Sequence, residues 1–279
     1  MKMKIIYLMC VLCFMNFYCF ALKIEGKVTD LFNGNPIGFV NIGIKMKHIG
    51  TITNERGEFM ITINDTLASE SLIFSCIGYK TKIAQIQNLR ISSGIVIIAL
   101  EPDAQILREV KIEARPMKEK SLGIKAHNPF LWGTAISDNK GDIIEVAQSV
   151  AVKNRETKIL SAHIYLNAAP ADSGTFRLNF YYLKNGKPDS LAVKKSIIRT
   201  LALTKGWITI DVSSESIYLK RDFAFAFEYL PTGKSVLEKK QLMYGGKLAG
   251  NNGYFRLSSQ GDWQKSRGAA YTMYLNVKQ

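Results

Sequence analysis

Short apolar runs, most of them alternating with polar residues and separated by turn-forming residues, dominate this chain of 279 residues. Between Leu22 and Leu100 about seven such runs recur at a spacing of roughly 8–12 residues, which is typical of a β-sandwich. No amphipathic helix of useful length interrupts them. The pattern predicts an all-β fold. Apolar residues make up 47% of the chain, which is enough apolar surface to fill sizeable cores. This composition excludes a disordered protein, a collagen-like protein and a polytopic membrane protein.

The first 21 residues have the features of an export signal. Lys2 and Lys4 precede an apolar run that ends at Ala21, and the last three residues of that run offer a small–x–small cleavage site. We expect residues 1–21 to be a cleaved signal peptide, which leaves no integral membrane span. Two alternatives remain open: the run, at the short end for spanning, could be retained as a single anchor, or Cys19 could be lipidated.

Only one cysteine, Cys76, remains in the chain once residues 1–21 are removed. An exported protein with a single thiol has no internal disulfide, so packing alone must stabilise it. Cys76 stands in the apolar, strand-like run 72–77. We therefore predict a buried, inert thiol.

Residues 22–101 carry four short motifs in a fixed order. The motifs are Ile24-x-Gly26-Lys27-Val28-x-Asp30, Pro36-Ile37-x-Phe39-Val40-Asn41-Ile42, Gly50-Thr51-x-Thr53-Asn54-x-x-Gly57-x-Phe59-x-Ile61 and Phe74-Ser75-x-Ile77-Gly78-Tyr79. Together they resemble the carboxypeptidase-regulatory-like domain of exported Bacteroidota proteins, over roughly Leu22 to Val110. The resemblance implies a transthyretin- or Ig-like, seven-stranded sandwich that serves as an accessory module without catalysis. Tyr79 is expected to bond its hydroxyl to the backbone.

The sequence gives little support to an enzyme. A zinc carboxypeptidase needs a His-x-x-Glu pair. The three histidines are followed at that spacing by Thr51, Phe130 and Leu166. Nucleophile elbows, phosphate-binding loops and dinucleotide-binding motifs are also missing. We therefore expect no catalytic, metal-binding or cofactor-binding residues. A glycosidase pair can lie far apart in sequence, so five carboxylates leave a cryptic hydrolase open: Asp142, Glu145, Asp211, Asp222 and Glu228.

Residues 102–128 are predicted to form a linker. Pro102, Pro116 and a run of mixed charge interrupt the apolar pattern there. Within the linker, Leu107-x-Glu109-Val110 resembles the short exit strand that follows many carboxypeptidase-regulatory-like domains. The remaining residues, 129–279, are again rich in predicted strands.

The segment 129–279 is predicted to be a second, jelly-roll-like sandwich. Its clearest strand runs are 157–166, 175–183, 191–203, 207–212, 223–230 and 270–277. Two runs place large side chains on one face: Phe176, Leu178, Phe180 and Tyr182 in one, and Phe223, Phe225, Phe227 and Tyr229 in the other. Such stripes suit the inner faces of two packed sheets, so we assign them to the core.

The positive charge is concentrated in residues 129–279. The whole chain has a net charge of +14, and this segment holds 21 basic against 12 acidic residues, a net +9. The basic doublets are Lys194-Lys195, Lys220-Arg221 and Lys239-Lys240. Such a field attracts anionic partners: an anionic glycan, lipopolysaccharide or an acidic envelope protein. Export and the lack of nucleic-acid-binding motifs argue against nucleic acid. A merely solvated basic surface is the alternative.

Two tryptophans of this segment, Trp132 and Trp263, stand among glycines and polar residues where an indole could stack on a sugar ring. Asn252 and Tyr254 would add a polar loop at the same end of the sandwich. Buried anchoring is the alternative for each tryptophan. The sequence predicts an exported, non-catalytic binding or scaffold protein that is periplasmic, associated with the outer membrane or at the cell surface. A carbohydrate-binding accessory module is the alternative function, followed by a cryptic glycan hydrolase.

Overall fold

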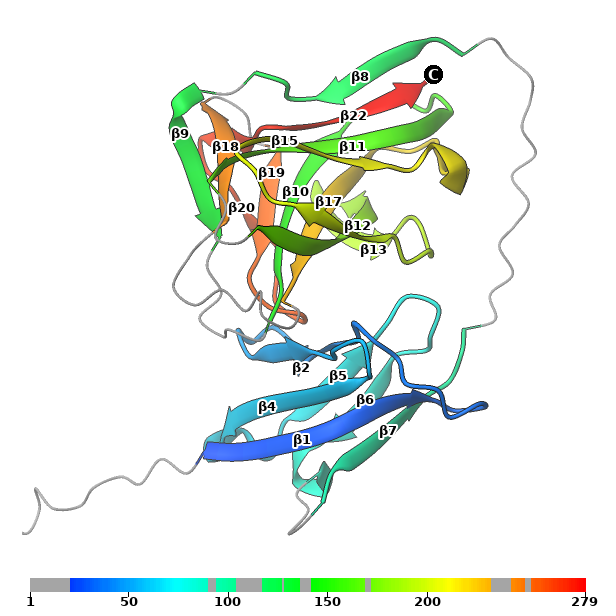
Figure 1. The fold of residues 1–279 in the computed structure, drawn as a ribbon, viewed down its shortest axis with the longest axis vertical. Coiled ribbons are helices and arrows are strands. Elements are labelled where there is room, and N and C mark those ends of the chain that lie inside the picture. Colours follow the sequence, from blue (N-terminus) through cyan, green and yellow to red (C-terminus); the bar gives the residue numbers. More distant parts are fainter. Residues whose placement is uncertain are drawn as a thin grey trace, which may run out of the picture.

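The computed structural model describes residues 21–89, 94–103, 117–126, 128–135, 142–168, 172–231, 242–248 and 252–279. Across these ranges the regular structure consists of strands and three short 3-10 helices: η1 (Asp65–Leu67), η2 (Ile86–Leu89) and η3 (Ser213–Glu215). The predicted all-β fold is confirmed (Figure 1). The predicted signal peptide, apart from Ala21, and the expected exit strand at Leu107–Val110 lie outside the described residues.

The N-terminal unit, residues 21–103, contains the predicted seven strands among its described residues. They are β1 (Ala21–Asp30), β2 (Asn41–Ile44), β3 (Gly50–Ile52), β4 (Glu58–Asn64), β5 (Ser71–Ser75), β6 (Lys82–Gln85) and β7 (Val96–Leu100). One sheet has the order β4-β1-β7 and the other β3-β2-β5-β6. Alternation along the strands fills the space between the sheets. In β4, for example, Phe59, Ile61 and Ile63 are buried while their neighbours are exposed.

The large sandwich, residues 117–279, holds the remaining described strands. They are β8 (Glu119–Gly123), β9 (Asn128–Ala135), β10 (Ile144–Val150), β11 (Thr157–Ala168), β12 (Ser173–Lys184), β13 (Lys187–Leu191), β14 (Ile198–Ala202), β15 (Gly206–Asp211), β16 (Tyr218–Leu219), β17 (Phe223–Leu230), β18 (Leu242–Leu248), β19 (Gly253–Arg256), β20 (Gln264–Lys265), β21 (Ala269–Tyr271) and β22 (Met273–Lys278). One sheet follows β13-β12-β17-β10-β19-β20, with β14 beside β12. The other follows β21-β18-β11-β22-β8, with β15 and β16 beside β11 and β9 beside β18.

Both predicted aromatic stripes lie in the core of the large sandwich. Phe176, Leu178 and Phe180 of β12 are buried in it, together with the phenylalanines and Tyr229 of β17, and half-buried Tyr182 packs against its edge. The run predicted as one strand over 191–203 is instead divided between β13 and β14, with irregular chain between them. β8, which falls in the segment assigned to the linker, pairs with β22.

The two units touch along one end of the large sandwich. Figure 1 shows the β2 side of the N-terminal unit facing the large sandwich, while β8 and β22 lie on the side away from it. Side chains of β12, β17 and the loop after β19 bond to residues of the N-terminal unit. A buried polar cluster therefore lies where sequence alone indicated only a linker between two sandwiches.

Candidate ligand-binding site at the junction of the two units

Four charged residues form a row across four neighbouring strands of the large sandwich. In the ladder, Arg177 of β12 stands opposite Glu228 of β17, Glu228 opposite Glu145 of β10, and Glu145 opposite Arg256 of β19. Side chains alternate between the faces of a strand, so these four project from the sheet face opposite the phenylalanines. We call these residues the charge row.

Each carboxylate of the charge row is held by several donors. Arg177 Nη1 donates to Glu228 Oε2 at 3.1 Å, and Arg256 Nε donates to Glu145 Oε2 at 2.5 Å. Asn179 Nδ2 donates to both carboxylates, at 2.8 Å to Glu145 and 2.7 Å to Glu228. Both glutamates are fully buried, and such charges persist inside a protein only when they are paired and hydrogen-bonded.

The two carboxylates differ in proton affinity. Burial raises the pKa of Glu145, and the neighbouring negative charge of Glu228 acts in the same direction. Burial alone would also raise the pKa of Glu228. There, however, the Arg177 and Arg256 guanidinium groups, with hydrogen bonds from Asn179 and Asn41, hold the pKa below its ordinary value. Glu228 is therefore the carboxylate most firmly kept ionised.

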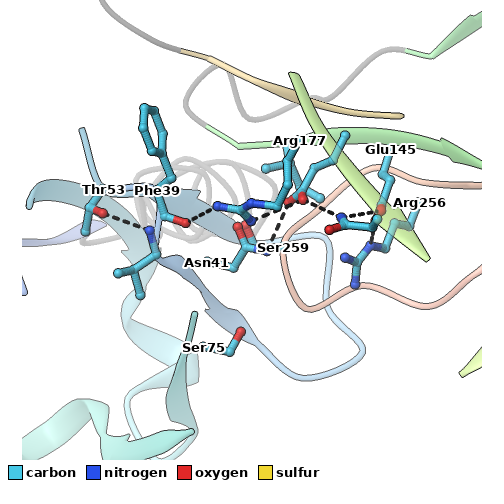
Figure 2. Close-up of polar contacts among 12 residues, drawn as sticks. Phe39, Asn41, Thr53, Ser75, Glu145, Arg177, Arg256 and Ser259 are labelled. Atoms are coloured by element: carbon cyan, nitrogen blue, oxygen red, sulfur yellow. Dashed lines mark hydrogen bonds and ion pairs between the residues drawn. The ribbon is translucent and has the colours of Figure 1, made fainter. Parts of the chain in front are cut away.

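The N-terminal unit caps one end of the charge row (Figure 2). Asn41 Nδ2, at the start of β2, donates to Glu228 Oε1 at 3.0 Å, and Arg177 Nη2 donates to the carbonyl oxygen of Phe39 at 2.5 Å. Phe39 has a φ of 58°, which is uncommon for a bulky residue, and its N–H donates to the Thr53 carbonyl at 3.1 Å. Backbone strain at Phe39 thus accompanies a carbonyl directed at a buried arginine.

A second polar contact joins the units beside the row. Buried Asp142 accepts hydrogen bonds from the backbone N–H and the Oγ of Ser259, the latter at 2.5 Å. Ser259 Oγ also lies 3.2 Å from the carbonyl oxygen of Thr51. A Cβ on Gly50 would lie 2.3 Å from Asp142 Oδ2, so only glycine permits this approach. Burial raises the pKa of Asp142 to about 6.

The loop after β19 completes the junction. Ser258 Oγ donates to the carbonyl of Lys47 at 3.0 Å, and Gln260 Nε2 donates to Ser75 Oγ at 2.9 Å. The N–H of Met46 donates to the Gln260 carbonyl at 3.0 Å. Polar contacts from side chains and backbone of both units thus join them. A small apolar cluster adds to these contacts, in which Ile52 and Phe39 of the N-terminal unit pack with Ile143, Leu230 and Ile198 of the large sandwich.

A pocket of about 300 Å³ lies in this junction and is lined by both units. Its lining includes Asn41, Ser75, Cys76, Tyr79 and Thr81 from the N-terminal unit, and Arg177, Asn179, Tyr181, Glu228 and Arg256 from the large sandwich. Three buried polar atoms of these residues have no hydrogen-bond partner within the described part of the chain: Asn41 Oδ1, Asn179 Oδ1 and Arg177 Nε. Because buried polar groups are nearly always paired, these atoms mark the pocket as the candidate ligand-binding site.

The sequence-predicted site residues lie elsewhere, and only some of them meet. Tyr254 is buried, and its hydroxyl donates to the Gly186 carbonyl at 2.5 Å, while half-buried Trp263 packs on the same cluster. Asn252 is exposed, and its carbonyl accepts from the Ser149 N–H. Trp132 stands opposite Gly245 in the β9–β18 ladder, and its side chain lies outside the described residues. That these four bind a ligand stays a prediction.

Trp263 lines an open groove of about 910 Å³, separate from the junction pocket. Its ring meets that of Tyr181 edge-to-face with centroids 5.4 Å apart, and the Arg256 guanidinium lies 5.1 Å from the ring centroid. Four basic and two acidic residues line the same groove: Lys184, Lys187, Lys265, Arg267, Asp189 and Asp262. Trp263 therefore contacts the charge row as well as the groove.

Sequence reasoning missed the junction residues, although it had named Glu145 and Glu228 among carboxylates without distinguishing context. A signal was available for Glu228. It is the only charged residue in Phe223–Leu230, a strand in which all eight residues are buried. A charge inside such a run requires a buried partner. Nothing comparable marks Arg177 or Asn41, because their partners come from strands distant in sequence.

Two expectations about the N-terminal unit need correction. Cys76 is half-buried rather than buried and lines the junction pocket. Burial still raises the pKa of its thiol, which favours the unreactive protonated form. The Tyr79 hydroxyl bonds to Asp30 Oδ2 at 3.1 Å rather than to the backbone.

Three side chains of the two basic doublets that the structure describes have partners within the chain. Lys194 pairs with Asp103 at 3.6 Å, Lys195 pairs with Glu215, and the Arg221 guanidinium lies 3.8 Å from the ring centroid of Tyr182. Lys239-Lys240 lie outside the described residues. Among the residues the structure places, no group of three or more His, Cys, Asp and Glu side chains could hold a metal ion. Nor does that part of the chain contain a helix long and apolar enough to cross a membrane.

Comparison with protein families identifies the N-terminal unit. Residues 24–112 match the family described as CarboxypepD_reg-like domain, so this part of the chain is a carboxypeptidase-regulatory-like domain, as its motifs predicted. The match covers less than half of the chain and does not extend to the charge row. No curated protein matches the chain.

Solved structures show only distant similarity. One contains the cysteine protease and lectin-like domains of Cwp84, a surface layer associated protein of Clostridium difficile, with 9% identity and a TM-score of 0.41. The match covers 86% of this chain but only 58% of that one. A structure of a variant of the clostridial cysteine protease Cwp84 after propeptide cleavage has 10% identity and a TM-score of 0.43, covering 92% and 70%. At these values the similarity says nothing about function.

Proposed function

We propose that this protein is an exported, non-catalytic binding protein of the bacterial cell envelope, and that the junction pocket is its ligand site. The observation that carries the proposal is the pocket between the units, where three buried polar atoms have no partner among the described residues. Ligand sites often lie between domains and use a few fixed polar groups. The carboxypeptidase-regulatory-like domain, an accessory module by resemblance, supports a role in binding.

The surroundings of the two carboxylates support binding over hydrolysis. A glycosidase needs one carboxyl group that carries a proton and another that acts as base or nucleophile. Glu145 accepts hydrogen bonds from Asn179, Tyr181 and Arg256, and such donors favour its ionised form. Glu228 is likewise surrounded by donors, from Arg177, Asn179 and Asn41. Burial nevertheless raises the pKa of Glu145, but Glu145 does not line the pocket. Glu228 does line it, and its neighbours hold its pKa below the ordinary value, so it is not the protonated acid that hydrolysis needs.

The test is binding of the exported protein to a glycan and lipopolysaccharide array at low and high salt. Each measurement is repeated with Thr81→Trp, which places an indole at an exposed position on the pocket lining. Ile83→Trp is the matched control. Ile83 lies two residues further along the chain, in β6, is 64% exposed and is not part of that lining. We expect binding that survives high salt and is lost only in Thr81→Trp. Retained binding in Thr81→Trp, or turnover of an array glycan, would contradict the proposal.

Export has its own test. When the full-length gene is expressed in a bacterial host, we expect the protein in the periplasmic or outer-membrane fraction, with Leu22 as its N-terminal residue. A protein that keeps residues 1–21 in the inner membrane would support the anchor alternative. A mass increase on Cys19 would support lipidation.

The Trp263 groove favours a second candidate function, carbohydrate binding to an anionic glycan. A half-buried indole beside four basic side chains can stack on a sugar ring while those side chains bind acidic groups. Under this alternative, Trp263→Ala weakens array binding and high salt weakens it further. Trp207→Ala is the control, since Trp207 is 39% exposed and does not line the groove. Equal binding by both variants would exclude the groove.

A further inference from the structure

We infer that the junction pocket binds a neutral, polyhydroxylated ligand the size of one sugar ring. This inference rests on the proposed function and specifies its ligand class. It follows from three properties of the pocket: the unpartnered polar atoms, the charge balance of the lining and the volume.

The unpartnered atoms require a ligand that both donates and accepts hydrogen bonds. Asn179 Nδ2 is fixed by two carboxylates and Asn41 Nδ2 by one, so both amide oxygens must point away from Glu228 as acceptors. Arg177 Nε is a donor whose guanidinium is already fixed through Nη1 and Nη2. These atoms have almost no exposed surface, so a ligand reaches them only when the lining side chains shift. Hydroxyl groups donate one hydrogen bond and accept others, so hydroxyls of one ligand can then pair with both kinds of atom.

The charges around the pocket already balance. Arg177, Lys194 and Arg256 supply three positive groups, while Asp103 and Glu228 of the lining and Glu145 behind Arg256 supply three negative ones. Because each of the three positive groups is already paired with a carboxylate, an ionised ligand would enter this partly enclosed pocket without a free counter-charge, which is costly. A neutral ligand avoids this cost. The anionic glycan suits the Trp263 groove, whose lining has more basic than acidic groups.

The volume limits the ligand to one ring. At about 300 Å³ the pocket is at the small end of ligand sites, which run from about 300 to 1,000 Å³. Tyr181, whose hydroxyl donates to Glu145 Oε1 at 2.9 Å, contributes an aromatic ring to the lining. Apolar aromatic surface beside fixed polar atoms matches a sugar ring, which has C–H faces and hydroxyl edges.

Cys76 provides a direct reporter of occupancy. It lines the pocket, it is half-buried, and peptide mass mapping can assign its modification in the full exported protein. The probes are glucose, galactose, mannose and N-acetylglucosamine, with galacturonate as the charged counterpart of galactose. Alkylation of Cys76 by iodoacetamide should slow about tenfold when a neutral sugar is present at ten times its Kd. Galacturonate should give much weaker protection.

Variants and a crystal structure make the test decisive. Thr81→Trp should abolish saturation-transfer NMR signals from the protecting sugar, and Ile83→Trp should retain them, with melting temperatures of both variants confirming the fold. A crystal of the wild-type protein soaked in that sugar should show hydroxyls on Asn41 Oδ1, Asn179 Oδ1 or Arg177 Nε. The inference is overturned if no neutral sugar protects Cys76, if galacturonate protects as well as galactose, or if the soaked pocket contains ordered water only.

The result separates this inference from the proposed function. Array binding that is lost in Thr81→Trp, with no protection of Cys76 by neutral sugars, would keep the pocket as the ligand site and remove the sugar. If a neutral sugar protects Cys76 but the protein binds nothing on the array, the inferred ligand class is supported and the proposed role in binding envelope glycans is contradicted.

Discussion

Strands β12, β17 and β10, at the centre of their sheet, are buried on both faces, but different interactions bury the two faces. The inner face carries the phenylalanines of β12 and β17 and packs against the second sheet of the large sandwich. The outer face carries the charge row, which contacts the N-terminal unit, and beside it Ala224 and Ala226, which belong to a small apolar cluster with Tyr181 and Tyr254. One face is stabilised by apolar area, and the other by a set of specific pairs.

The difference shows what each face contributes. Apolar packing is non-directional, and it tolerates exchange of one apolar side chain for another of similar volume. A buried ion pair adds little stability over an apolar replacement, but removing one partner is very costly. The charge row therefore contributes orientation more than stability: Arg177 and Glu228 accept the N-terminal unit only where Phe39 and Asn41 meet them.

The largest predicted effects compare the faces directly. Phe227→Ala on the inner face should lower the free energy of unfolding by about 3–5 kcal/mol, because it leaves a cavity. Arg177→Met on the outer face should lower it by about 3–5 kcal/mol, because it leaves Glu228 buried without its main partner. Urea denaturation of each variant measures both values.

A second substitution then distinguishes the faces. Adding Glu228→Leu to Arg177→Met removes the orphaned charge, so we expect it to restore at least half of the lost free energy. Adding Phe176→Ala to Phe227→Ala enlarges a cavity and should lower the free energy further. If both double variants were less stable than their single-variant parents, the stability lost in Arg177→Met would not come from an orphaned charge, and the proposed difference between the two faces would be wrong.

The fold was largely predictable, because short-range alternation reports which strands have one face in a core. The seven strands of the N-terminal unit and the stripes of β12 and β17 follow from that alternation. The strands that the sequence did not reveal include β10, where every residue but Ser149 is buried, so alternation is lost. Short edge strands such as β16 and β20 are too brief to leave a pattern.

The candidate site was not predictable, because its residues meet only through strand pairing between distant segments. Arg177 is one polar position in an alternating strand, and nothing local indicates that it faces Glu228, 51 residues away, rather than solvent. Asn41, 187 residues from Glu228, is further removed still. Trp132 and Trp263 were predicted as ligand-binding residues because their glycine and polar neighbours are visible in the local sequence. The local sign of the junction was a single charge within an otherwise uncharged, buried strand: Glu228 in β17 and Glu145 in β10.

A pH measurement tests the junction with the next largest effect. The folded pKa of Asp142, about 6, lies above its ordinary value of 3.8, so its stabilising contribution is complete below 3.8 and is lost as pH rises through 6. The difference in unfolding free energy between wild type and Asp142→Asn should therefore change by about 3 kcal/mol between pH 3.5 and 7, against the wild type at higher pH. Denaturant unfolding at several pH values measures it.

His163 acts with the opposite sign and serves as the control. Burial, with the nearby Lys125 charge, lowers its pKa from 6.5 to about 4, so its contribution is present above 6.5 and is lost as pH falls through 4. It lies on β11 and bonds to Thr209 and Asn276, away from the junction. His163→Gln should leave the Asp142-dependent difference unchanged. A flat wild-type-minus-Asp142→Asn curve would show that the carboxyl group is not held in this contact.

Gly50→Ala tests the close approach of the two units with a smaller effect. The added Cβ would lie 2.3 Å from Asp142 Oδ2 and 2.8 Å from the Ile42 carbonyl, so the junction must shift. Overpacking of this kind costs about 1–3 kcal/mol. Gly34→Ala is no suitable control, because Gly34 has a φ of 72° and any side chain there is strained. Gly133→Ala, where the nearest atom is at 3.4 Å, should be tolerated. Thermal unfolding should show a lower midpoint for Gly50→Ala alone.

The smallest effect on stability is expected for a solvent-exposed arginine–glutamate pair, which matches the buried pair of Arg177 and Glu228 in residue types. Arg56 Nη2 lies 3.1 Å from Glu58 Oε2, the same distance as Arg177 Nη1 from Glu228, but both side chains are largely exposed. Water screens the exposed pair, and removing Arg56 leaves Glu58 solvated rather than stranded. Arg56→Met should therefore leave the unfolding midpoint unchanged within error, whereas Arg177→Met lowers it strongly. A comparable loss in both variants would mean that the arginine side chain, and not the burial of its partner, determines the cost at the junction.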